Sequence, residues 1–390
     1  MVEDGGDAVF RVLTPEERPQ AEALWRYSFQ DDPAFISWYF ARRAGDVLAL
    51  GQGEVRAQAV TVPVRLCVRG CERDARILSG VTTAPAYRGQ GYMGRLLAGT
   101  CGWLHSQGVP LAALYPFDYD FYRRWGWTDC GRVQKLRVPL ARLSAAPAPD
   151  ARVVALTDIA GREQDFLRVY EAYYGRYWGC CKRDAHAFAL RMEECALQEG
   201  RAALILGPDG PEGYLFYHVQ GDALAVDEWA AATHRARRAG LAYLAGHAST
   251  LAEAHLIVPE DDPLPHLLPD SRGLVTLQPH TMLRIIDLQA FIDGLPARRS
   301  TRATVTLTVR DDLAPWNRGC WRIGGRDGLM RVYPVAGDGP AISIQALTRW
   351  LMGECSAQDL VARGAGLPPH TVETMDDILV KHPVCLPEMY

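Results

Sequence analysis

A glycine-rich turn between a strand and a helix constrains the fold of this chain more than any other feature. Residues 76–83 predict a strand, and Tyr87-Arg-Gly-Gln-Gly-Tyr-Met-Gly94 leads directly into a helix predicted to end near Ser106. Glycines let a backbone approach a ligand closely, and the unpaired N–H groups at a helix start, with the helix dipole, bind anions. The sequence therefore predicts a pyrophosphate-binding turn in an α/β (α+β) protein. The helix prediction rests on apolar residues that share one face at helical spacing, namely Met93, Leu96, Leu97, Cys101 and Leu104.

Length and composition restrict the class of protein. At 390 residues the chain predicts two or three domains, and 48% hydrophobic with 23% charged residues is the balance of a packed globular protein. The 42 Lys and Arg against 46 Asp and Glu give a net charge of −4, so no basic excess is present to hold nucleic acid. A mild acidic balance suits a cationic substrate.

Targeting and metal signals are weak. The N-terminus has no signal-peptide pattern, and no apolar run approaches the roughly 18 residues of a membrane span, so no membrane partner is expected. The ten cysteines are scattered, and Cys67 and Cys71 have no second pair at zinc spacing. We therefore expect free thiols, no metal and a reducing, cytoplasmic location.

The pattern along the chain divides it into three blocks, predicted as domains over residues 1–143, 151–284 and 285–390. Each block alternates strands with helices, and the second repeats the order of the first. The first block predicts helical structure over 18–43 with a break at Pro33, and a strand pair over 127–139. The second predicts helices near 161–179, 184–199 and 232–248 with strands near 201–207, 212–219, 222–228 and 253–258. The third predicts strands near 302–310, 319–325 and 328–333 with helices near 343–353, 356–363 and 371–378.

The turn resembles a known coenzyme-binding segment. Arg88-Gly-Gln-Gly-Tyr-Met is similar to the Arg/Gln-x-x-Gly-x-Gly/Ala segment of the GNAT N-acetyltransferases, whereas no Gly-Lys-Ser/Thr of a Walker loop follows. The alternative is a glycine-rich helix entry without a ligand. The resemblance implies acetyl-CoA as cosubstrate, with backbone groups of Val81 and Thr83 on the pantetheine arm and the thioester, and amides of 88–94 on the pyrophosphate. The implied coenzyme-binding residues are Val81, Thr82, Thr83, Arg88, Gly89, Gln90, Gly91, Tyr92, Met93 and Gly94.

A second segment supplies a candidate acid. Phe121-Tyr-Arg-Arg-Trp-Gly-Trp127 is similar to the Phe-Tyr-x-x-x-Gly-Phe segment of the same family, whose Tyr lies near the coenzyme sulfur. Because the thiolate leaving group has a pKa near 8.5 and a tyrosine one near 10, Tyr122 can donate the proton at modest cost. The alternative is a core aromatic residue with a satisfied hydroxyl.

Over the whole chain the block order resembles the Eis (enhanced intracellular survival) family: two GNAT-like blocks and a C-terminal domain similar to sterol carrier protein. The resemblance also rests on Met282-Leu-Arg-Ile-Ile-Asp-Leu, Asp311-Asp-Leu-Ala-Pro-Trp-Asn317 and Trp321. It implies that the terminal α-carboxylate, here of Tyr390 where the family usually has Phe, serves as base, and that the chain forms a homo-oligomer, a hexamer. A free terminus is the alternative. The second block lacks the glycine-rich turn and is expected to bind no coenzyme.

Substrate-binding candidates are acidic or aromatic residues in segments expected to face the pocket. They suit a cationic amine of aminoglycoside or polyamine type, although each residue is alternatively a helix cap, a turn residue or a solvated carboxylate. Two rival functions stay open: a protein or peptide lysine N-acetyltransferase, and a lipid-binding protein with a vestigial coenzyme site. The candidates are Asp31, Asp32, Trp38, Asp118, Asp120 and Glu388.

Overall fold

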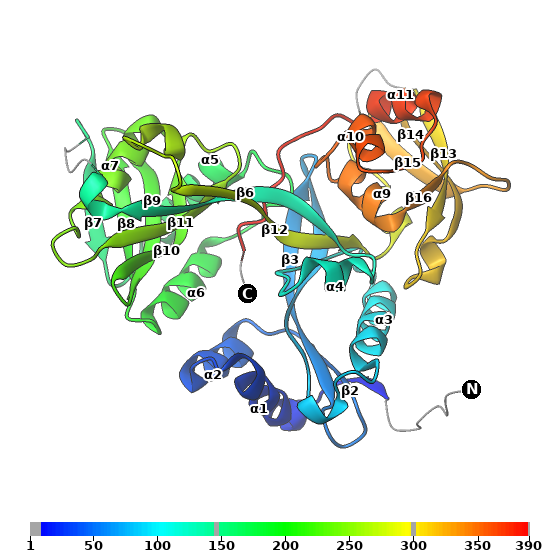
Figure 1. The fold of residues 1–390 in the computed structure, drawn as a ribbon, viewed down its shortest axis with the longest axis horizontal. Helices are drawn as coiled ribbons and strands as arrows, with labels where there is room; N and C mark the ends of the chain where they lie inside the picture. The colour runs from blue at the N-terminus through cyan, green and yellow to red at the C-terminus, as the bar shows by residue number, and fades with distance from the viewer. Residues whose placement is uncertain (1–8, 144–147, 298–301, 389–390) are drawn as a thin grey trace. The chain divides into compact units, whose positions relative to one another are not determined.

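The computed structural model describes residues 9–143, 148–297 and 302–388, and they form two compact units (Figure 1). The first unit comprises the chain to Cys130 with Thr281–Val384 and the segment from Glu388, and the second comprises Gly131–His280 with Cys385–Pro387. Within the described ranges, no helix is both long and apolar enough to cross a membrane.

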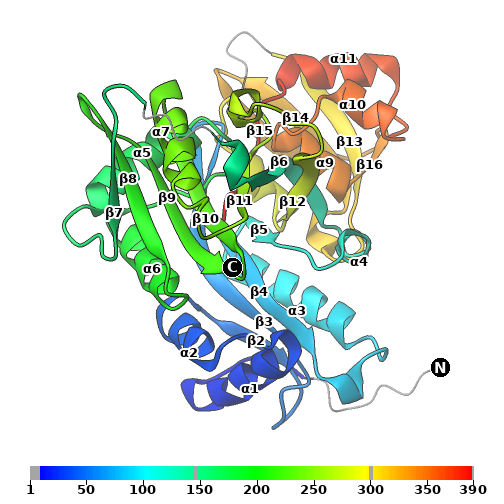
Figure 2. The same cartoon turned by 60° about the vertical axis from the view of Figure 1, so that its left-hand side comes forward.

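The first unit opens with a mixed sheet in the order β1-β2-β3-β4-β5-β12, antiparallel from β1 to β4 and parallel between β4 and β5. Helices α1 and α2 lie on one side of strands β2 to β4 and α3 lies on the other (Figure 2). The strands are β1 (Phe10–Val12), β2 (Val47–Leu50), β3 (Ala57–Val68), β4 (Cys71–Thr83), β5 (Leu111–Leu114) and β12 (Val275–Ile285), of which Met282–Ile285 pair with β5. The helices are α1 (Arg18–Phe29), α2 (Pro33–Arg42), α3 (Tyr92–Ser106) and α4 (Tyr119–Arg123).

Local sequence explains these helices. The break predicted at Pro33 is confirmed: Gln30 adopts a left-handed conformation that ends α1, and the Asp32 carboxylate accepts the Ala34 amide at 2.7 Å to begin α2. The apolar face predicted for α3 is confirmed at four of its five positions, which are buried, while Met93 is only partly buried. Tyr27 on α1 is an exposed aromatic residue, with 63% of its side chain exposed.

The rest of the first unit is a four-stranded sheet in the order β15-β14-β13-β16 with helices beside it. Large side chains that are at most 1% exposed form its core, among them Phe291, Ile323, Trp350 and Met352. The strands are β13 (Thr304–Arg310), β14 (Gly319–Arg326), β15 (Leu329–Pro334) and β16 (Ala341–Ser343). The helices are α8 (Leu288–Ile292), α9 (Ile344–Leu351), α10 (Ala357–Ala362) and α11 (Pro369–Ile378).

The second unit has its own strand order, β6-β11-β10-β9-β8-β7, antiparallel except between β10 and β11. Buried aromatic side chains of α5 and α6 pack on β9, with Phe166 and Phe188 against Tyr214. The strands are β6 (Thr128–Pro139), β7 (Arg152–Leu156), β8 (Arg201–Gly207), β9 (Gly210–Gln220), β10 (Ala223–Ala231) and β11 (Glu253–Pro259). The helices are α5 (Glu163–Tyr174), α6 (Ala185–Ala196) and α7 (His234–Ala245).

Two element predictions are wrong. Residues 127–139 form no strand pair: Thr128–Pro139 is one strand, because its residues from Val133 onward pair with β11 instead of folding back. The helix predicted over 161–179 covers only Glu163–Tyr174. The domain boundary predicted at 284/285 lies inside strand β12, near its end, where the strand pairs with β5.

Candidate active site

At the candidate site, strand β4 extends beyond the end of its parallel neighbour β5. Its pairing with β5 runs from Ala75 opposite Leu111 to Leu78 opposite Leu114, and β4 continues to Thr83. On its other edge the register with β3 shifts between Gln58 and Val60, which marks a β-bulge. The bulge holds Gly80 at φ 54°, where an added Cβ would lie 2.3 Å from the Trp25 ring. Beyond Leu78, β5 therefore leaves one edge of the β4 backbone for another partner.

The turn after β4 is shaped to meet an anion. Gly89 and Gly91 have φ of 74° and 76°, which L side chains rarely adopt, and Gly91 is the N-cap of α3. An added Cβ at either glycine would meet nothing within 4 Å, so the space in front of the turn is open. No side chain caps α3, and the first N–H groups of a helix have no partner inside it. A diphosphate fits this arrangement.

Polar side chains of the turn brace its backbone. Arg88 Nε donates to the Thr83 carbonyl at 3.1 Å, and Gln90 Nε2 donates to the Ala86 carbonyl at 2.9 Å. Arg56 Nη1 donates to the Tyr92 hydroxyl at 3.0 Å. These contacts restrict the conformation of the turn. The buried Thr83 hydroxyl has no hydrogen-bond partner in the described part of the chain, which leaves it for a ligand beside the turn.

Gly94 serves packing. A Cβ at Gly94 would lie 2.2 Å from the Trp125 ring, so the missing side chain lets Trp125 pack closely against α3. Gly89, Gly91 and Gly94 also have the Gly-x-Gly-x-x-Gly spacing of dinucleotide-binding turns. The sheet argues against that use, because β4 is antiparallel to β3 whereas the dinucleotide fold places parallel strands around its first strand.

Tyr122 lies on the short helix α4, where Asp118 accepts the Phe121 amide at 2.8 Å and caps the helix. Its side chain is 2% exposed, and its ring contacts Phe117 and Trp127. Burial raises the pKa of the Tyr122 phenol above its ordinary value. Among the described residues the hydroxyl has no hydrogen-bond partner, and its raised pKa keeps it protonated and makes it a weaker acid than a free tyrosine.

The substrate-binding candidates have local partners. Asp31 accepts a hydrogen bond from Trp25 Nε1 at 2.7 Å, and the Arg43 guanidinium lies 5.3 Å from the centre of the half-buried Trp38 ring. Asp32 and Asp118 are helix caps, and Asp120 pairs with Arg123 at 2.5 Å. Glu388 is buried, with 7% exposure. Tyr390 lies outside the described residues. The binding roles of these residues stay predictions.

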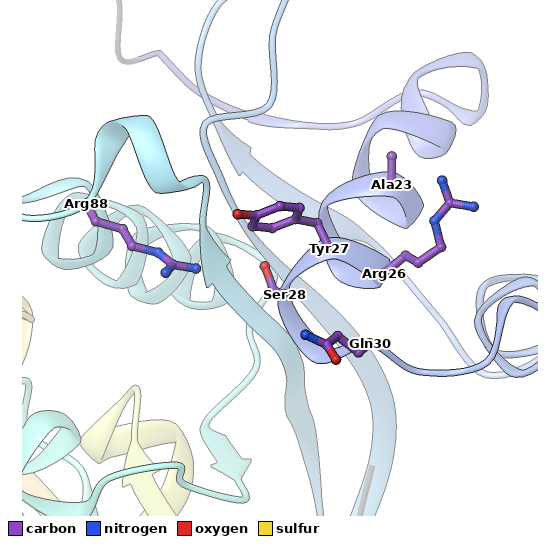
Figure 3. Close-up of a pocket in the computed structure, with 6 residues that line it drawn as sticks. All are labelled: Ala23, Arg26, Tyr27, Ser28, Gln30 and Arg88. Carbon is purple, nitrogen blue, oxygen red and sulfur yellow. The ribbon is translucent and has the colours of Figure 1, made fainter.

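A cleft of about 650 Å³ lies between the end of α1 and the turn, lined by Ala23, Arg26, Tyr27, Ser28, Gln30 and Arg88. The hydroxyls of Tyr27 and Ser28 point toward the Arg88 guanidinium, whereas Arg26 points away (Figure 3). The Thr82 hydroxyl donates to Ser28 Oγ at 2.8 Å and links the end of β4 to α1. Sequence analysis missed Tyr27 and Ser28 as site residues, because nothing local distinguishes them from other residues of an amphipathic helix. No group of three or more His, Cys, Asp or Glu that could hold a metal occurs among the residues described.

Family comparisons agree with these observations. Residues 9–130 match an acetyltransferase (GNAT) domain, residues 179–285 match a second acetyltransferase (GNAT) domain, and residues 288–386 match a sterol carrier protein domain.

Known proteins are similar to this chain in sequence or in fold. An uncharacterized N-acetyltransferase of Streptomyces griseus is 29% identical over 290 residues, which cover 66% of this chain and 65% of that protein. The N-acetyltransferase Eis of Mycobacterium bovis is 29% identical over 336 residues, 81% of this chain and 78% of that protein. A solved structure of a probable N-acyltransferase from Enterococcus faecalis has the same fold, with a TM-score of 0.85 at 21% identity over 98% of this chain and 100% of that one.

The fold and the turn define the class: a protein built from two acetyltransferase (GNAT) domains and a sterol carrier protein domain. Within that class the chain is similar to the N-acetyltransferase Eis of Mycobacterium bovis. GNAT domains imply acetyl-CoA as cosubstrate, and the open turn before α3 fits its diphosphate.

Proposed function

We propose that this chain transfers the acetyl group of acetyl-CoA to a primary amine of a cationic small molecule, of aminoglycoside or polyamine type. One observation carries the proposal: β4 ends beyond its β5 partner and continues through a turn with Gly89 and Gly91 into the uncapped start of α3. That arrangement belongs to the first GNAT domain, so we assign the reaction to it.

In this proposal the protein binds the coenzyme with its backbone. Amides of residues 88–94 hold the diphosphate, and backbone groups of Val81 and Thr83, with Thr82 between them, align the pantetheine arm along the free edge of β4. A backbone N–H of this edge stabilises the charge that develops on the thioester oxygen, and a donor aimed at such charge contributes about 3 kcal/mol.

The chemistry is direct transfer. The amine nitrogen attacks the thioester carbonyl, a C–N bond forms, and the C–S bond breaks. Tyr122 donates its proton to the departing sulfur. Its hydroxyl is buried and protonated, and its raised pKa makes the donation costlier than from a free tyrosine. The ammonium proton goes to the α-carboxylate of Tyr390. An α-carboxyl of ordinary pKa near 3.5 is a weak base for an ammonium near 10, so this role requires a desolvated carboxylate or a bridging water.

Acidic and aromatic residues support the substrate class. Asp31, Trp38, Asp118 and Glu388 are the candidates for holding a cation by charge and stacking, and Glu388 is buried two residues before the terminus. We further propose that the chain is cytoplasmic and assembles as a homo-oligomer, a hexamer by its resemblance to the Eis family. The boundaries 1–143, 151–284 and 285–390 stay our proposal for its domains.

The test is CoA release from acetyl-CoA with a panel of aminoglycosides, polyamines and lysine peptides. Wild type is compared with Tyr122→Phe and with a chain that lacks Tyr390. Tyr333→Phe, a change of the same kind on the exposed face of β15, is the matched control. We expect turnover of the cationic small molecules, and a decrease in kcat of about a hundredfold for each of the two site changes.

The outcomes separate the parts of the proposal. Turnover of lysine peptides alone would replace the small-molecule substrate with a protein one. Full activity without Tyr390 would remove the terminal carboxylate from the mechanism, and full activity of Tyr122→Phe would remove the acid. CoA release from none of the amines would contradict the proposed function itself.

A further inference from the structure

The short segment that carries Tyr122 is held by side chains from the C-terminal part of the first unit. Tyr122 lies near the end of α4, and residues 123–129 lead from there into β6. Arg284 on β12 and Gln345 on α9 each donate a hydrogen bond to a backbone carbonyl of this segment, and Arg349 on α9 pairs with Asp129. Gln345 and Arg349 belong to the range that matches a sterol carrier protein domain.

Arg284 contacts the segment through a buried guanidinium. Its guanidinium is 0% exposed, and Nη1 donates to the Trp125 carbonyl at 2.9 Å while Nη2 donates to Asp311 Oδ1 at 2.6 Å. Gly126 has φ of 83°, and an added Cβ there would lie 1.5 Å from Arg284 Nη1. The turn after Tyr122 therefore has glycine both for its backbone conformation and for the space that the guanidinium occupies.

Other hydrogen bonds, besides the one from Arg284, hold the Asp311 carboxylate in place. Its carboxylate accepts the Leu313 and Ala314 amides at 3.1 Å each, and it accepts Asn317 Nδ2 at 3.1 Å. The Asp311-Asp-Leu-Ala-Pro-Trp-Asn317 segment thus forms a closed loop around one carboxylate. That carboxylate orients Arg284, and Arg284 in turn orients the Trp125 carbonyl.

Gln345 contacts the backbone two residues nearer to Tyr122 than Arg284 does. Its Nε2 donates to the Arg123 carbonyl at 2.9 Å, next to Tyr122 in the chain. Its neighbour Ile344 packs at the same turn, since its Cγ2 lies 3.2 Å from the position of a Gly126 Cβ. Arg284 and Gln345 therefore each donate a hydrogen bond to the backbone shortly after Tyr122.

We propose that Arg284 and Gln345 are positioning residues for Tyr122. The Tyr122 hydroxyl has no hydrogen-bond partner among the described residues, so its direction depends on the packing of the ring and on the backbone of the α4 turn. A displacement of about 1 Å at a reacting group can lower a rate by about a hundredfold. The inference rests on the proposed role of Tyr122 as acid, and it gives the sterol carrier domain a part in acetyl transfer.

A double-mutant cycle in the full chain tests it, with Gln345→Ala made in wild type and in Tyr122→Phe. Gln345 is partly exposed, so its loss leaves the fold intact. In wild type we expect kcat to fall roughly three- to tenfold, the size of one lost hydrogen bond, with the KM for acetyl-CoA unchanged. In Tyr122→Phe the same change should have no further effect, because the group that it positions is gone. Gln289→Ala, an exposed Gln of α8, is the control and should leave kcat unchanged.

Equal decreases from Gln345→Ala in both backgrounds would overturn the inference, because a general loss of structure acts with or without the acid. If Tyr122→Phe retains full activity, the proposed acid itself fails, and this result is distinct from additive decreases. Arg284→Lys gives a second measurement: one amino group cannot reach both Asp311 and the Trp125 carbonyl. It should lower kcat at least tenfold in wild type and not in Tyr122→Phe, with melting temperatures measured for all four chains.

Discussion

The two GNAT domains differ most at the junction where the bulged strand meets the following helix. In the first, residues 84–91 separate β4 from α3, and Gly91 leaves the helix start uncapped. In the second, only Ala232 and Thr233 separate β10 from α7. The Thr233 hydroxyl accepts the Ala236 amide at 3.0 Å and donates to Glu212 at 2.6 Å. At the second junction a side chain of the protein therefore accepts a hydrogen bond from an amide at the helix start. At the first junction no described side chain does so.

The strands before the two junctions are alike. β4 pairs with β5 only over Ala75–Leu78, and β10 pairs with β11 only over residues 223–225. Both show a register shift against the preceding antiparallel strand, and in β10 it lies between Val226 and Glu228. The same scaffold therefore occurs twice, and the two domains differ in the length and residues of the turn that follows the bulged strand.

A buried charge network occupies the second domain near its bulge. Arg183 forms two hydrogen bonds with the Glu228 carboxylate, at 2.8 and 3.1 Å, and Tyr214 donates to the same group. Burial opposes ionisation of Glu228, but Arg183 and Arg191 outweigh it and lower the pKa of the carboxyl below its ordinary value. We interpret this network as structural.

The largest expected effect concerns that network. Glu228→Ala leaves Arg183 and Arg191 buried without their carboxylate, so we expect the free energy of unfolding to fall by about 3–5 kcal/mol in urea titrations. Acetyl-CoA affinity, measured by calorimetry below the unfolding transition, should not change. Glu171→Ala, at a 51% exposed partner of Lys182, is the control, with an expected loss below about 1 kcal/mol. A weaker coenzyme affinity in Glu228→Ala would show that the second domain takes part in coenzyme binding.

The next effect sharpens the contrast between the junctions. Gly91→Val places a β-branched residue at φ 76° in the open turn, so we expect acetyl-CoA to bind roughly a hundredfold more weakly. Gly221→Val is the matched control: Gly221 has φ of 63° in the β9–β10 turn, and a Cβ there also meets nothing within 4 Å. It should lower stability and leave coenzyme affinity unchanged. Equal losses of affinity in both variants would contradict the assignment of the site to the first domain.

A smaller effect is expected at the second helix start. Thr233→Ala removes the cap of α7 and should lower the free energy of unfolding by about 1 kcal/mol. Thr250→Ala, in the exposed turn after α7, serves as its control. A loss of acetyl-CoA affinity in Thr233→Ala would contradict our assignment of the coenzyme to the turn before α3.

The last prediction is that kcat does not decrease as the pH rises toward about 10. Burial raises the pKa of Tyr122, so its folded pKa lies above the value near 10 of a free tyrosine. The phenol then stays protonated below about pH 10, and we expect no alkaline decrease of kcat up to that point. A decrease centred below it that disappears in Tyr122→Phe would show that the phenol titrates with an ordinary pKa.

Sequence analysis predicted those structural features whose signals are local. Glycine at 89 and 91 is demanded by backbone conformation alone, and the apolar spacing of α3 follows from helix geometry. The break at Pro33 follows from the same kind of rule. Such features depend on neighbours in the chain, so they can be inferred from the chain's order of residues.

Other features depend on partners far along the chain. The short strand β2 escaped prediction, and Met282–Ile285 pair with β5, more than 160 residues away in sequence. The space that Gly94 leaves is filled by Trp125, and Asp31 is engaged by Trp25. No periodicity or motif encodes which of these pairs will meet.

The sequence by itself determined that a glycine-rich turn joins a strand to a helix, that this turn occurs once among two similar blocks, and that Tyr122 follows it in a Phe-Tyr-x-x-x-Gly segment. Only the tertiary structure decided that β4 outruns β5, that Tyr27 faces solvent, and that Arg284 and Gln345 hold the turn after Tyr122. The physical reason is the range of the interactions: backbone conformation and helix periodicity act over a few residues, whereas burial and side-chain hydrogen bonds join whichever segments the packed core brings together.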